Sequence, residues 1–203
     1  MSIVSRLLVG LIAFIFINTA AAHSFNLVFI APLTNNAGES ALNGFLLATR
    51  EQDSHENEES DGHLGGLDSY IYKVEIMKGE MNLPQKLEST IRKSEPLFAV
   101  GPGLNASILN MLEKHGVVAI DPMSSKFWAS NAADPDQLKL MNGDNFASEF
   151  GRSYGREPDL QAIHGYLAAR IIATVVRNSS EQSLSDPAKL RQTLSEVLAK
   201  MHW

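Results

Sequence analysis

The stretch LFAVGPGLNASILNMLEKHGVVAIDPMSS, residues 97–125, indicates the fold class most clearly. Residues 96–103 and 117–122 contain short apolar runs, and each is typical of a buried strand. The segment between them, 104–116, is predicted to be a helix that ends at Gly116. Because a right-handed crossover returns the chain to the same end of the sheet, two strands joined by one helix run parallel. The stretch therefore predicts a strand-helix-strand unit of a parallel sheet.

The same alternation precedes this unit. Residues 25–33 are apolar and residues 70–79 are rich in β-branched and aromatic side chains, so both are predicted strands. Residues 35–52 and 82–95 carry apolar side chains at helical spacing, and Asn82 is expected to cap the second of these helices. The chain is therefore predicted to be α/β, with three layers around a doubly wound, mostly parallel sheet of about four strands.

Two later apolar stripes predict helices that cover this sheet. Apolar residues recur every three or four positions over 160–175, and again over 190–201. A parallel sheet must be covered on both faces. These helices are therefore expected to complete the outer layer.

The N-terminus is predicted to be a secretory signal. It has one positive charge at Arg6, an apolar run over 7–17 and three alanines at 20–22. We expect export to the periplasm and cleavage after Ala22, with an uncleaved anchor as the alternative. No later segment is apolar enough to span a bilayer, so no membrane insertion is expected after cleavage.

Composition excludes several classes of function. The chain has no cysteine, which rules out a cysteine nucleophile and a thiolate metal site. Its formal net charge is −6, and the stretch 51–68 contains seven acidic residues and no basic one. The sequence has no basic footprint for nucleic acid or anionic lipid.

The acidic stretch offers a possible cation site, with both imidazole and carboxylate ligands close together in sequence. Its spacing does not match an EF-hand loop, so a solvated, mobile loop is the favoured interpretation and no metal is predicted. The candidate ligands of the alternative are His55, Glu58, Asp61 and His63.

In an open parallel sheet, ligands bind outside the carboxyl ends of the strands. The turns expected there are 31–36, 101–107 and 121–125. Gly101 and Gly103 would let the backbone approach a ligand, and the N-terminus of the helix that follows suits a carboxylate. The alternative is that the glycines only form a tight turn between strand and helix.

Three stretches of the chain resemble one family of binding proteins. LVFIAPLT (27–34), the stretch 97–125 and FGRSYGREPDLQAIHGYLAARIIATVV (150–176) are similar to periplasmic solute-binding proteins of the leucine/isoleucine/valine-binding type. That family has the type I periplasmic-binding fold, and its two lobes close over the ligand. In the family, two turns of the first lobe hold the α-carboxylate and α-amino groups of an amino acid. The resemblance thus implies these ligand-binding residues: Gly103, Leu104, Asn105, Met123, Ser124 and Ser125.

The resemblance also predicts the domain organisation. In the family, the strand that matches 117–121 leads into a second lobe, whereas here the chain passes directly to a segment that returns to the first lobe. The chain is therefore expected to be reduced to a single lobe. The expected boundaries are a signal peptide at 1–22 and one α/β lobe at 23–203, made of strand and helix units (23–124), a linker that replaces the second lobe (125–144) and covering helices (145–203).

The resemblance implies an exported solute-binding component of an ABC-type importer for amino acids or other small solutes. One lobe leaves much of a ligand in water, so binding is expected to be weak or dependent on a partner. The alternative is a periplasmic accessory protein that has lost ligand binding. The expected partners are a small polar solute such as an amino acid, an ABC permease or another periplasmic protein, and a second copy of the chain.

Enzyme motifs do not support a catalytic role. The sequence has no Gly-x-Ser-x-Gly elbow, P-loop or paired-histidine metal motif. The chain is therefore predicted not to be an enzyme and to need no cofactor.

Overall fold

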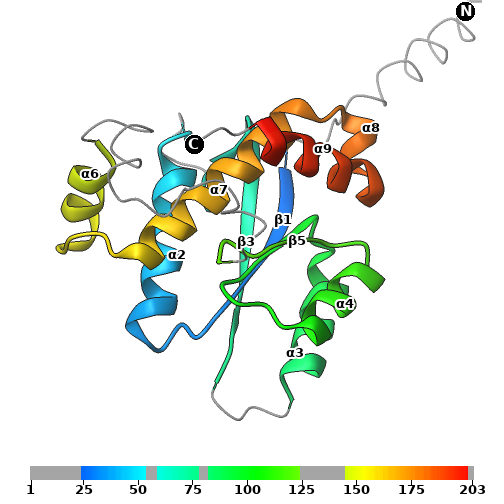
Figure 1. The fold of residues 1–203 in the computed structure, drawn as a ribbon, viewed down its shortest axis with the longest axis horizontal. Helices are drawn as coiled ribbons and strands as arrows, with labels where there is room; N and C mark the ends of the chain where they lie inside the picture. Colours follow the sequence, from blue (N-terminus) through cyan, green and yellow to red (C-terminus); the bar gives the residue numbers. More distant parts are fainter. Residues whose placement is uncertain (1–23, 54–58, 78–81, 124–144, 201–203) are drawn as a thin grey trace, which may run out of the picture.

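The computed structural model describes residues 24–53, 59–77, 82–123 and 145–200 (Figure 1). Its strands are β1 (Ser24–Ala31), β2 (His63–Leu64), β3 (Leu67–Glu75), β4 (Phe98–Val100) and β5 (Val118–Ile120). Its helices are α2 (Asn36–Arg50), α3 (Leu83–Ser94), α4 (Ala106–Lys114), α6 (Asn145–Tyr154), α7 (Leu160–Asn178), α8 (Glu181–Leu184) and α9 (Pro187–Lys200). The predicted signal peptide (1–22) and linker (125–144) lie outside the described residues.

The strands form one five-stranded sheet in the order β2-β3-β1-β4-β5. Strands β3, β1, β4 and β5 are parallel, and β2 pairs antiparallel with β3. The prediction of a mostly parallel α/β sheet is therefore confirmed. The expected number of about four strands missed β2, because two residues are too short to show an alternation of apolar and polar side chains.

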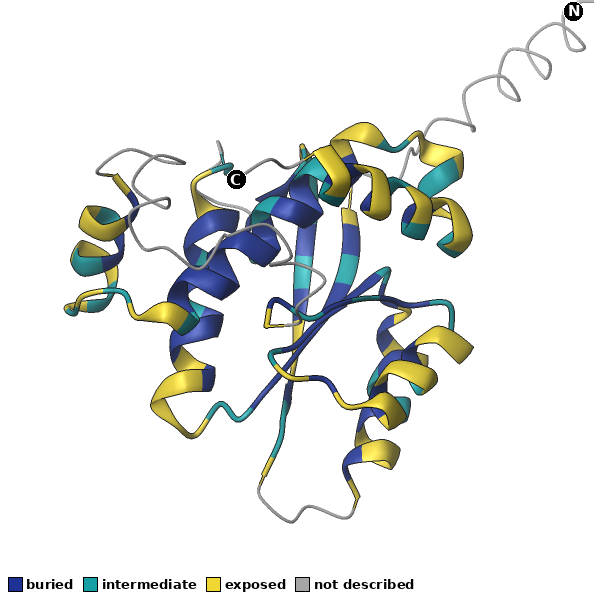
Figure 2. Cartoon of the chain, in the orientation of Figure 1, coloured by how far each residue is buried: buried dark blue, intermediate teal, exposed yellow. Residues whose placement is uncertain are grey.

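Helices cover both faces of this sheet, which accounts for the continuous apolar run of β1. Leu27 and Phe29 point to the face covered by α2, α7 and α9. Val28 and Ile30 point to the opposite face, which α3 and α4 cover. Figure 2 shows the result as a buried centre within helices whose outer sides are exposed. The three-layer, doubly wound arrangement that the periodicity predicted is confirmed.

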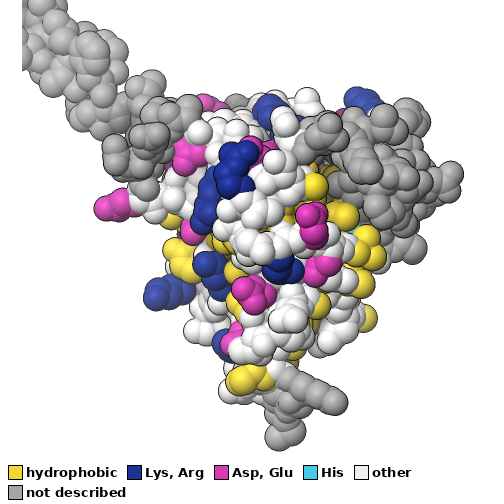
Figure 3. Space-filling view, turned by 90° about the vertical axis from the view of Figure 1, so that its left-hand side faces the viewer, with side chains coloured by type: hydrophobic (Ala, Val, Ile, Leu, Met, Phe, Trp, Pro, Cys, Tyr) yellow, Lys and Arg dark blue, Asp and Glu magenta, His cyan; other side chains and the backbone are white. Residues whose placement is uncertain are grey.

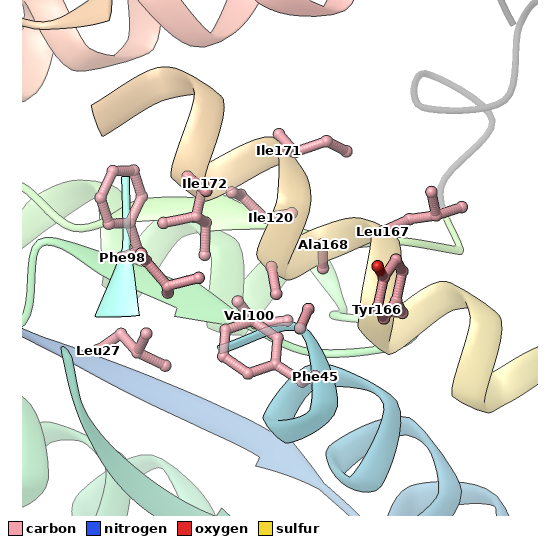
Figure 4. Close-up of a cluster of buried hydrophobic side chains, with 14 of the residues drawn as sticks. Leu27, Phe45, Phe98, Val100, Ile120, Tyr166, Leu167, Ala168, Ile171 and Ile172 are labelled. Atoms are coloured by element: carbon pink, nitrogen blue, oxygen red, sulfur yellow. The ribbon is translucent and has the colours of Figure 1, made fainter. Parts of the chain in front are cut away.

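Helices α2 and α7 make the closest helix contact of this core. Each contributes a glycine at the crossing, because a Cβ on Gly44 would overlap the backbone of Ala162 and one on Gly165 would overlap the backbone of Ala41. Figure 4 shows side chains of both helices, including Phe45 of α2 and Ala168 of α7, in one cluster with the strand residues Leu27 and Val100. The short side chains allow α7 to lie directly on α2, so that both helices cover the same face.

The structure confirms the predicted end of α4 but not the cap predicted at the start of α3. Gly116 has φ +74° and follows α4, as the sequence predicted. The expectation for Asn82 was wrong, because its side chain makes no capping hydrogen bond and its backbone, at φ −98° and ψ 6°, lacks the extended conformation of a cap. Pro84 lies in the first turn of α3 and has no N–H group. This turn therefore has one backbone donor fewer for a cap to satisfy.

The surface over α2 and α6 carries charges of both signs. On the face drawn in Figure 3, Lys and Arg side chains are interspersed with Asp and Glu, and apolar side chains show between them. This face presents no continuous basic area. Among the described helices, none is both long and apolar enough to cross a membrane.

Candidate functional site

The carboxyl ends of β1, β4 and β5 form one edge of the sheet, which lies toward the bottom of Figure 1. Strands β4 and β5 are direct neighbours, with Val100 opposite Ile120. The Gly101 N–H extends this pairing by donating to the Ile120 carbonyl at 3.1 Å. The pairing brings the turn that follows β4 next to the turn that follows β5, as the sequence predicted.

The two glycines of the first turn are explained by the turn itself. A Cβ on Gly101 would lie 2.7 Å from the Ile30 carbonyl oxygen of β1, so close packing against the sheet requires glycine there. Gly103 has φ +74°, a backbone conformation that favours glycine, and the space around its Cβ position is open. The local geometry therefore supports the interpretation of these glycines as parts of a tight turn.

Asp121, directly after β5, joins the two turns by accepting hydrogen bonds from backbone N–H groups of both. Its Oδ1 accepts hydrogen bonds from the Gly103 N–H at 3.0 Å and the Met123 N–H at 2.9 Å. Its Oδ2 accepts one from the Leu104 N–H at 3.1 Å. Two of these donors, at Gly103 and Leu104, belong to the turn before α4, where the sequence predicted a site that suits a ligand carboxylate. In this structure they bind a carboxylate of the protein.

The other predicted ligand-binding residues differ in what their side chains contact. The Asn105 side chain caps α4, because its Oδ1 accepts from the Ile108 N–H at 3.0 Å. Leu104 places its side chain in the core beneath α4, where it is 7% exposed. Met123 is 47% exposed at the edge. Ser124 and Ser125 lie outside the described residues, so their role stays a prediction.

The N-terminus of α7 adds a second carboxylate to this region. Asp159 caps α7 by accepting from the Ala162 N–H at 2.9 Å, and it also accepts from the Ser40 hydroxyl of α2. Burial opposes ionisation of Asp159, but these two hydrogen bonds and the charge of Arg156 hold its pKa below the usual value. Asp159 is therefore a charged link between α2 and α7.

His164 lies one turn further along α7 and is buried. Burial lowers its pKa, while the charges of Asp121 and Asp159 act in the opposite direction. The influence of Asp121 places His164 within electrostatic range of the β5 turn. The sequence pattern did not indicate that Asp121 and Asp159 would both lie near it.

His164 predicts how stability depends on pH. Because its pKa is lower in the folded state than the ordinary 6.5, the unfolded state binds more protons as the pH falls below that value. The stability that the neutral His164 contributes to the folded state is therefore lost as the pH falls. We expect His164→Gln to lose less stability than the native chain between about pH 7.5 and about pH 5.5, as measured by urea unfolding. An equal loss in both proteins would contradict the lowered pKa, and the range above pH 7.5 provides the control.

The acidic stretch 51–68 is partly described, and its two described candidates bind protein groups. The ring of His63 bridges two carboxylates, with Nδ1 3.1 Å from Asp53 and Nε2 2.7 Å from Asp68. The Asp61 Oδ2 accepts from the Ile71 N–H of β3 at 2.8 Å. The contact with Asp53 attaches the β2–β3 hairpin to the segment that follows α2. His55 and Glu58 lie outside the described residues, and no group of three or more His, Asp or Glu among the described residues could hold a metal ion.

Two hollows of the described surface lie away from the carboxyl edge of the sheet. One, of about 510 Å³, lies between α7 and α9 and includes Thr174 and Lys200 in its lining. The other, of about 460 Å³, lies at the amino ends of β4 and β5 and includes Leu97 and Val117. Neither contains any of the predicted ligand-binding residues.

The sequence matches no protein-family model and no curated protein. The structure is similar to two solved structures of transporter binding proteins. One is the branched-chain amino acid transporter substrate binding protein LivJ of Streptococcus pneumoniae in complex with isoleucine (TM-score 0.61, 12% identity, 85% of this chain and 88% of that chain covered). The other is an ABC transporter solute binding protein of R. palustris in complex with benzoate (TM-score 0.61, 11% identity, 87% of this chain and 85% of that chain covered).

Proposed function

Because the chain has the type I periplasmic-binding fold, with a sheet that matches one lobe, we propose that it is an exported solute-binding-like component associated with an ABC-type importer of amino acids or other small solutes. The observation that carries this proposal is the pairing of β4 with β5. The turns that follow these strands lie side by side at the carboxyl edge of the sheet, where ligands bind in open parallel sheets. The similarity to two solute-binding proteins supports it. Export follows from the signal predicted at 1–22, and the proposed location is the periplasm.

We further propose that any solute is bound weakly or with the help of a partner. The described residues at the edge include three that are exposed: Gly103, Asn105 and Met123. A good small-molecule site buries about 70–90% of its ligand, and one open edge cannot surround a solute to that extent. A second copy of the chain, or a permease, could supply the missing surface.

A second function is favoured by Asp121. Because the N–H groups of Gly103 and Leu104 already donate to its carboxylate, a chain that has lost amino-acid binding would have the same geometry. In that case the lobe serves as a periplasmic accessory protein that binds another exported protein. Both functions are those of a binding protein rather than an enzyme.

Isothermal titration of the exported chain with a panel of amino acids, benzoate and small polar solutes without a carboxylate, such as amino-acid amides, separates these functions, together with its oligomeric state by light scattering. For the isolated chain we expect dissociation constants no tighter than about 1 mM, which corresponds to about −4 kcal/mol. Micromolar binding by a monomer would contradict dependence on a partner. Absence of heat at millimolar solute, in the monomer and in any dimer, would contradict the importer role and favour the accessory role.

A further inference from the structure

We propose that Asp121 is a built-in occupant of the carboxylate-binding donors at the ligand edge, and that it excludes carboxylate solutes from them. This inference rests on the proposed function only in taking the turns after β4 and β5 as the ligand edge. It concerns the class of solute that the edge accepts. A solute that binds the native edge carries no carboxylate at this position.

The hydrogen bonds of Asp121 carry the proposal. Both of its oxygens accept from backbone N–H groups, with N···O distances of 2.9–3.1 Å for Gly103, Leu104 and Met123. Each of these groups has one hydrogen to donate. Bonds to an ionised acceptor are stronger than neutral ones, and the two oxygens reproduce the way in which a free carboxylate would be held. A solute carboxylate and the Asp121 carboxylate therefore compete for the same donors.

The tether favours Asp121 in this competition. Asp121 follows β5 directly and precedes Pro122, so extended backbone conformations are favoured at this position. A group held in position by the chain acts at an effective concentration of millimolar or higher, and well-oriented groups exceed molar values. A dissolved carboxylate at millimolar concentration would not displace it.

The position of Asp121 also distinguishes it from an ordinary local turn. The Met123 bond spans two residues and is the usual contact of an aspartate that begins a turn. The Gly103 and Leu104 bonds span 18 and 17 residues and join two separate turns of the sheet edge. Removal of the side chain would therefore leave a cradle of N–H donors between two loops that the β4–β5 pairing still holds together.

Chemical rescue tests the proposal. Asp121→Ala should melt at a lower temperature than the native chain, and sodium acetate should raise its Tm saturably relative to sodium chloride of equal ionic strength. At ten times the dissociation constant we expect a rise of about 3–5 °C. The native chain should show no specific rise with acetate or with isoleucine.

Asp186→Ala is the matched control. Asp186 also accepts from two backbone N–H groups, those of Ala188 and Lys189. Both donors lie at the start of α9, far in sequence from the turns after β4 and β5. Acetate should not rescue this variant. Rescue of both variants to the same extent would show a general salt effect and overturn the proposal.

Two further outcomes would overturn it. One is an Asp121→Ala protein that folds and does not respond to acetate. The other is a native chain whose Tm rises with acetate or isoleucine, and this result does not depend on how the variant folds. Should Asp121→Ala not fold, the native-chain measurement still tests the proposal, because it needs no variant. Failure of the proposed transport role would appear instead as an absence of solute binding in the titrations above, with the rescue unaffected.

Discussion

Gly165→Ala is expected to lower the free energy of unfolding by about 3 kcal/mol, as measured by urea denaturation. The added methyl group would overlap the backbone of Ala41, and a backbone atom cannot move aside as a flexible side chain can. Helix α7 would have to move away from α2, and the packing of both on the sheet would loosen. Gly44→Ala, on the opposite side of the same crossing, should have a similar effect because its methyl group would overlap Ala162.

Gly151→Ala is the matched control for these variants. Gly151 lies inside α6, and the nearest atom to its Cβ position is the Arg156 carbonyl oxygen at 3.9 Å, an ordinary contact. Because alanine favours helix more than glycine does, we expect a gain of up to about 1 kcal/mol. If Gly165→Ala unfolded at the same urea concentration as Gly151→Ala, the close approach of α2 and α7 would be wrong.

Phe45→Ala is expected to lower the free energy of unfolding by about 3–5 kcal/mol. Phe45 of α2 is fully buried and packs edge to face against Phe29 of β1, with ring centroids 5.5 Å apart. Its removal would leave a cavity between the sheet and the α2–α7 layer. Leu109→Ala is the control, because Leu109 of α4 is 37% exposed and should cost much less. Equal effects of the two variants, in the same urea titration, would contradict the layer assignment.

The fold was predictable where long periodic segments are buried. Helix α7 and strand β1 have patterns that leave few alternatives, since one covers a sheet face and the other is buried on both sides. Strand β2 was not predictable, because two residues carry no periodicity and its position depends on contacts such as that between His63 and Asp53. The cap expected at Asn82 failed for a similar reason, since residue type alone does not specify the backbone conformation before a helix.

The location of the candidate site was predictable from the sequence, but its hydrogen bonds were not. The order of strands and helices indicated that the turns at Gly103 and Met123 would share one edge. The bond from the Met123 N–H to Asp121 is a local contact that an aspartate beginning a turn commonly makes. The bonds from Asp121 to Gly103 and Leu104 depend on the register of β4 with β5, which no single-sequence pattern specifies. The role of Asp121 as an acceptor for the donors assigned to a ligand was therefore missed.

We propose that the ligand edge of this lobe is occupied by the protein's own carboxylate. The most direct test is the backbone amide spectrum of the ¹⁵N-labelled chain during titration with isoleucine to about 10 mM, about ten times a dissociation constant of 1 mM. We predict that the amide resonances of Gly103, Leu104 and Met123 keep their positions, because their hydrogens stay bonded to Asp121. A saturable shift of these three resonances in the native chain would contradict the claim.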